Sequence, residues 1–108
     1  PAVVTTLVNA TLGPVSVAPF SSAASLDMGV AAVEYLNGKR AVILKQHGII
    51  TIGGNLKEAL YAAVYMEDAA KTYCVARSIR AVPELTPSQI QDAVDSFMNY
   101  GQITQPKK

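Results

Sequence analysis

Residues 40–55, Arg-Ala-Val-Ile-Leu-Lys-Gln-His-Gly-Ile-Ile-Thr-Ile-Gly-Gly-Asn, decide how this chain folds. The run at 41–44 contains β-branched residues and does not alternate with polar ones, which is typical of a strand buried on both faces. A second apolar run at 49–52 ends at a glycine pair. The stretch therefore predicts two neighbouring strands joined by a short polar connection.

His47, the only histidine of the chain, lies where the first of these predicted strands ends, and Gly48 follows it. An imidazole held at the edge of a rigid sheet is well placed for a metal ligand or a proton carrier. A hydrogen-bonded structural role is the alternative. One imidazole cannot make a zinc site by itself, because such sites need three or four protein ligands. Both interpretations stay open on spacing alone.

The composition is apolar for a single domain of 108 residues. Hydrophobic residues make up 50% of the chain and charged residues 16%, against roughly 25% charged residues in typical globular domains. A small domain has a large surface for its volume and needs polar residues to cover it. We therefore expect the surplus apolar surface to be covered by a missing part of the same fold or by other subunits of an oligomer.

The net charge and the lack of apolar targeting segments argue against nucleic-acid and membrane partners. The formal net charge is +1 and the basic residues are scattered, apart from the Lys107-Lys108 end, so no nucleic-acid partner is indicated. No apolar run approaches the roughly 20 residues that cross a bilayer, and no signal segment is present. The single cysteine excludes an internal disulfide framework and favours a cytoplasmic location.

The first third of the chain predicts short strands and one helix. Residues 1–8 carry two apolar pairs and predict a strand that is cut off at its beginning, and residues 15–18 predict a second, short strand. A helix is predicted from Ser22 or Ser25 to Asn37, because apolar residues recur there at helical spacing. These residues are Leu26, Val30, Val33 and Leu36.

A long helix is predicted from Asn55 to about Arg80. Asn55 is a good N-cap, and Glu58 stands where a capping box places its acidic residue. We expect Glu67, near one edge of the apolar face, to be partly buried in a salt bridge or to lie on the surface. The apolar face is predicted to contain Ala59, Leu60, Ala63, Val64, Ala70, Tyr73, a buried Cys74 and Ile79.

A last helix follows an extended linker at residues 82–85. Thr86 and Gln89 form a second capping box, and Gly101 ends the helix. Tyr100 lies at that end, where a tyrosine is usually a packing anchor with a wet hydroxyl. The order of helices and strands predicts an α/β fold.

Together these segments resemble the class II aldolase/adducin family, in particular the C-terminal half of its aldolases. The resemblance covers most of the chain and is best from Ala18 onward. It implies the C-terminal part of a three-layer α/β/α domain with a largely antiparallel central sheet. Residues 1–108 would form the C-terminal portion of that single domain, and its N-terminal portion would lie outside this chain. The segments that carry it are Leu44-Lys-Gln-His-Gly-Ile-Ile, Asn55-Leu-Lys-Glu-Ala-Leu, Glu67-Asp-Ala-Ala, Val82-Pro-Glu-Leu-Thr and Phe97-Met-Asn-Tyr-Gly.

The resemblance also implies a metal site shared with residues outside the chain. His47 matches the third histidine of a His₃ Zn²⁺ site, whose other two ligands and acidic base are expected upstream. Tyr100 matches a catalytic tyrosine that reaches a neighbouring subunit's active site, where it would donate a proton. The resemblance therefore implies a homotetramer, and the isolated chain is expected to be inactive.

The function that the resemblance implies is a zinc-dependent aldolase-type lyase. Its substrate would be a small sugar phosphate or a related hydroxy-carbonyl compound, cleaved through a metal-stabilised enediolate. Ala23 and Thr5 stand where aldolases of the family carry aromatic residues, so the substrate stays open. The alternatives are a dehydratase, epimerase or decarboxylase on the same scaffold, and a non-catalytic, adducin-like assembly domain.

Overall fold

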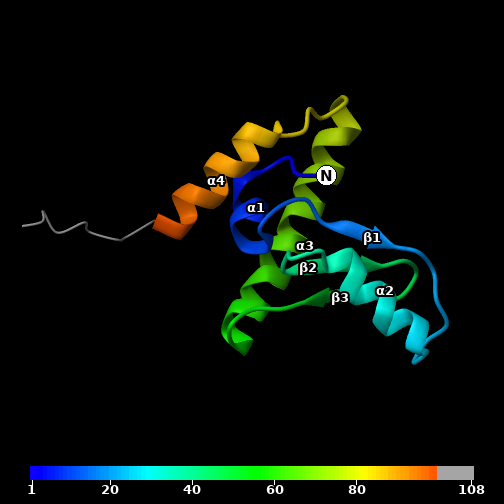
Figure 1. Ribbon diagram of the computed structural model, residues 1–108. Helices are drawn as coiled ribbons and strands as arrows, with labels where there is room; N and C mark the ends of the chain where they lie inside the picture. Colours follow the sequence, from blue (N-terminus) through cyan, green and yellow to red (C-terminus); the bar gives the residue numbers. More distant parts are fainter. Residues whose placement is uncertain (100–108) are drawn as a thin grey trace, which may run out of the picture.

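The computed structural model describes residues 1–99, so Tyr100 and the residues after it lie outside the described part. Helices and strands alternate along much of the chain, which confirms the predicted α/β class (Figure 1). In chain order the elements are helix α1 (Thr5–Thr11), strand β1 (Ser16–Ala18), helix α2 (Leu26–Leu36), strands β2 (Ala41–Leu44) and β3 (Gly48–Thr51), and helices α3 (Leu56–Ile79) and α4 (Pro87–Asn99).

The described strands form a three-stranded sheet in the order β1-β2-β3. β1 is parallel to β2, with Val17 opposite Ile43, and β2 is antiparallel to β3, with Ile43 opposite Ile49. The sheet is therefore mixed, and the expectation of a largely antiparallel sheet is not met within these strands. The reason is the connection: α2 crosses between β1 and β2, which returns the chain in the same direction, whereas a tight turn joins β2 to β3.

Helices lie on both faces of this sheet. Ala41 of β2 joins a core cluster with Leu7 of α1 and with Met66 and Ala69 of α3. Side chains alternate along a strand, so the fully buried Val42 points to the opposite face. There α2 contacts β1 and β2 (Figure 1). The prediction that β2 is buried is confirmed for its first two residues, and the last two are half-buried.

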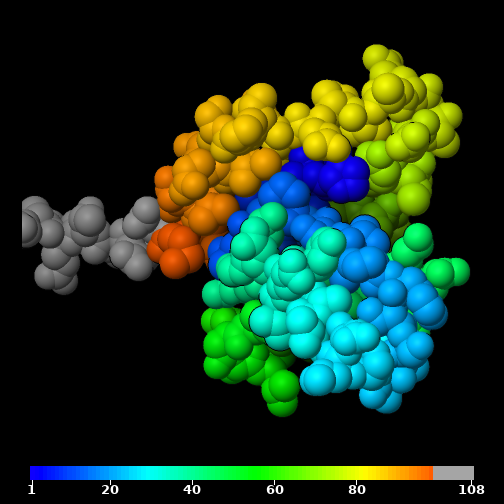
Figure 2. Space-filling model, turned by 45° about the vertical axis from the view of Figure 1, so that its right-hand side comes forward, coloured from blue at the N-terminus to red at the C-terminus, as the bar shows by residue number. Residues whose placement is uncertain are grey.

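A second core joins α4 to α1 and not to the sheet. Ala2, Val8 and Ala93 are its buried members. The Leu85 amide donates to the Ala2 carbonyl at 2.8 Å, which ties the segment before α4 to the start of the chain. In Figure 2 the α4 segment, in orange, accordingly lies beside the dark blue start of the chain.

The strand predicted at residues 1–8 is wrong, because α1 occupies this region. Val4, the residue before the helix, is extended. The adjacent pair Leu7 and Val8, which suggested a strand, lies between the two cores: Leu7 joins the sheet cluster and Val8 joins the α4 cluster. A short helix with cores on two sides places neighbouring apolar residues in different cores.

The predicted helix starts are confirmed by their caps. Ser25 accepts a hydrogen bond from the Met28 amide at 3.2 Å at the start of α2. Asn55 accepts from the Glu58 amide at 2.9 Å at the start of α3. At the start of α4 the Thr86 hydroxyl accepts from the Gln89 amide at 3.3 Å.

The predicted apolar face of α3 is wrong: none of its eight predicted residues is buried, although Ala59, Ala63 and Tyr73 are half-buried. The buried residues are Ala62, Met66 and Ala69, whereas the predicted Leu60 and Val64 are 61% and 54% exposed. Apolar residues occur on all sides of α3, so its sequence does not single out one face for burial. The structure places mainly alanines against α1, which permits close packing.

Two further predictions on α3 are resolved by exposure. Cys74 is exposed, so its predicted burial is wrong. Glu67 is exposed too, and its carboxylate lies 3.3 Å from the Lys71 ammonium, one helical turn later. The predicted surface role of Glu67 is confirmed.

Many large apolar side chains of the described residues remain on the surface, on α2, β3, α3 and α4 alike. Even so, none of the helices within residues 1–99 combines the length and apolar character that crossing a membrane requires. The exposed apolar residues therefore agree with the expected surplus of apolar surface.

Candidate functional site

His47 lies in the tight turn that joins β2 to β3. The turn closes with a hydrogen bond from the His47 amide to the Leu44 carbonyl at 2.9 Å. Gln46 has a positive φ of 61°, and Gly48 has a φ of 154°, a conformation that L side chains rarely adopt. The glycine after His47 is therefore needed by the backbone, and the histidine is held at one end of the sheet.

Two residues of the β1–α2 connection hold the His47 ring. The imidazole stacks on the Phe20 ring, with the ring centroids 5.4 Å apart and the planes 12° from parallel. Its Nε2 lies 2.7 Å from the Ser21 carbonyl oxygen. A carbonyl only accepts hydrogen bonds, so Nε2 donates, and the lone pair of the neutral ring is then on Nδ1.

Sequence reasoning did not identify Phe20 and Ser21 as part of this site. The missing information was the parallel pairing of β1 with β2. Parallel strands end at the same edge of a sheet, so the residues after β1 meet the residues after β2. Pro19-Phe20-Ser21 directly after the predicted strand was the available signal.

His47 fits the role of one metal ligand and no more. A neutral imidazole whose second nitrogen donates to a carbonyl is the usual form of a metal-binding histidine. No group of three or more His, Cys, Asp or Glu side chains that could hold a metal occurs within residues 1–99. The second predicted site residue, Tyr100, lies outside the described residues. Within the described residues His47 is thus a single candidate ligand and not a complete metal site.

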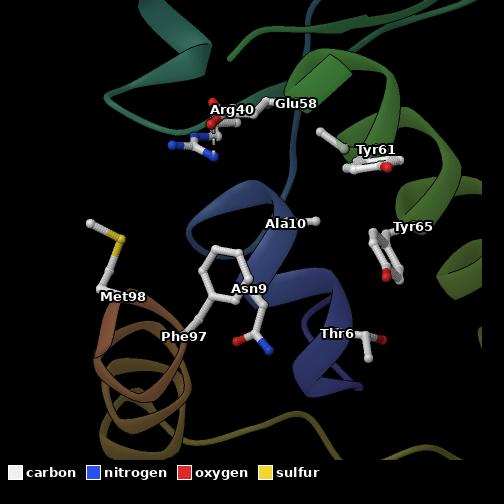
Figure 3. Close-up of a pocket in the computed structure, with 10 residues that line it drawn as sticks. Thr6, Asn9, Ala10, Arg40, Glu58, Tyr61, Tyr65, Phe97 and Met98 are labelled. Carbon is white, nitrogen blue, oxygen red and sulfur yellow. Dashed lines mark ion pairs between the residues drawn. The ribbon is translucent and has the colours of Figure 1, made fainter. Parts of the chain in front are cut away.

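A separate groove of about 600 Å³ lies between α1, α3 and α4. Figure 3 shows aromatic side chains from two helices around it, with the Arg40–Glu58 pair at one end. Those two charged groups are 3.8 Å apart. Its lining residues are Thr6, Asn9, Ala10, Arg40, Glu58, Tyr61, Ala62, Tyr65, Phe97 and Met98. His47 is not among them, so the groove and the histidine are distinct features.

The sequence comparisons find related aldolases. The family model described as Class II Aldolase and Adducin N-terminal domain matches residues 1–74. The 5-deoxy-D-ribulose 1-phosphate aldolase of Bacillus thuringiensis serovar kurstaki is 32% identical over 91 residues, which are 83% of this chain and 43% of that protein. The L-fuculose phosphate aldolase of Escherichia coli K12 is 28% identical over 85 residues, which are 78% of this chain and 40% of that protein.

The structural comparison agrees with these matches. A solved structure of L-fuculose 1-phosphate aldolase matches with a TM-score of 0.86 and 26% sequence identity, covering 91% of this chain and 46% of that one. The chain thus spans less than half the length of the relatives it matches. Because the family model covers residues 1–74 of 108, the chain belongs to the class II aldolase/adducin family.

Proposed function

We propose that this chain is part of a zinc-dependent, class II aldolase-type lyase that cleaves a small sugar phosphate or a related hydroxy-carbonyl compound. In this proposal residues 1–108 form the C-terminal portion of a three-layer α/β/α domain, and the rest of the domain lies upstream. The family match and the names of the relatives, all aldolases of phosphorylated sugars, support the reaction class.

The observation that carries the proposal is the orientation of His47. Its ring is stacked on Phe20 and hydrogen-bonded to the Ser21 carbonyl, so one nitrogen is held and the other is left with its lone pair. Outer contacts of this kind fix the tautomer and direction of histidines that bind metals. His47 as a whole is exposed, and a neutral ring that donates through Nε2 keeps a lone pair on Nδ1 that a metal could use.

The remaining roles follow from this assignment. Zn²⁺, held by His47 and by two histidines outside the chain, would supply Lewis-acid chemistry. Tyr100 would donate a proton in the active site of a neighbouring subunit, which requires a homo-oligomer, with a tetramer as the first choice. The single, exposed Cys74 favours the reducing cytoplasm as the location.

A non-catalytic assembly domain is the second candidate. The large apolar side chains left exposed on α2, α3 and α4 would serve such a role as well. The same surface is needed by an oligomeric enzyme, so exposure alone does not decide between them. Binding of zinc through His47 would distinguish the enzyme from the assembly domain.

The test is His47→Ala in a protein that carries the upstream ligands, with Lys45→Ala as the matched control in the same turn. We expect His47→Ala to lose zinc and aldol cleavage together, while its thermal midpoint without metal stays near that of the parent. Lys45→Ala should keep both. A His47→Ala protein with full zinc content and activity would exclude the proposal.

A further inference from the structure

We draw no further inference here: the strongest candidate, the groove of about 600 Å³ between α1, α3 and α4 that Tyr61, Tyr65 and Phe97 line, carries none, because nothing in the part of the chain that the structure describes shows what covers it.

Discussion

At the scale of single residues, the contacts around His47 fix the orientation of its ring, which the sequence alone does not reveal. The sequence placed it at the end of a strand but left two roles open. The structure adds a stacked ring on one side and a carbonyl at 2.7 Å on the other. An exposed imidazole without such contacts would rotate freely and lose conformational entropy on binding a metal. Phe20 and Ser21 are therefore positioning residues for His47.

Phe20→Leu tests this positioning. The change removes the stacked ring, and because Phe20 is 58% exposed it should hardly affect folding. In the protein that carries the upstream ligands we expect the zinc affinity to fall about 10-fold, the lower end of the effect of outer contacts on metal sites. Zinc titration measures it. In the isolated chain, the ring-current shift of the single histidine's protons should disappear as well.

Phe97→Leu is the matched control for that variant. Phe97 is similarly exposed, at 45%, and lines the groove between α1, α3 and α4, to which His47 does not contribute. Its zinc affinity should equal that of the parent protein. Equal affinities in all three proteins would contradict a positioning role for Phe20.

Tyr100→Phe separates catalysis from packing. A packing anchor needs only the ring, so the change would then be nearly silent, whereas a proton donor needs the hydroxyl. General acid–base groups contribute typically about 10²–10⁴-fold in rate, and we expect a fall in turnover within that range. Zinc content and oligomeric state should stay unchanged. Tyr35→Phe on α2 is the control, and equal turnover of the two variants would return Tyr100 to a packing role.

At the scale of elements, local signals predicted the structure best where one residue's chemistry decides it. The caps at Ser25, Asn55 and Thr86 follow from a side-chain oxygen next to free backbone amides, and all three are present. The failures lie where tertiary contacts decide. Residues 5–11 are helical because two cores meet there. Nothing local in the sequence indicates the second core.

Asn55→Ala tests the contribution of the α3 cap. Asn55 accepts from the Glu58 amide at 2.9 Å, and removing an N-cap acceptor costs about 1 kcal/mol of folding free energy. We expect a loss of that size in chemical denaturation of the isolated chain. Asn55→Asp keeps an acceptor and should stay close to the parent. An equal loss in both variants would mean that the cap bond is not the cause.

At the scale of the whole molecule, the composition predicted that apolar surface would be left uncovered, but it could not predict where on the molecule that surface lies. A charged content of 16% indicated uncovered apolar surface, and the structure places it on α2, β3, α3 and α4. Which of these surfaces is covered depends on strand order and helix placement, which no local pattern encodes. His47 could be predicted because its position follows from the local strand pattern. Phe20 and Ser21 could not, because their contact with His47 depends on the pairing of β1 with β2.

The last prediction concerns what the 108-residue chain does alone. Tetrahedral zinc sites need three or four protein ligands, and residues 1–99 hold no group of three or more His, Cys, Asp or Glu side chains suited to a metal. We therefore expect the purified, dialysed chain to retain no stoichiometric zinc by elemental analysis and to show no aldol cleavage. Joined to a part that supplies two histidines, it should bind one zinc per chain, and His47→Ala should abolish that gain. Tight one-to-one zinc in the isolated chain would contradict a site shared with residues elsewhere.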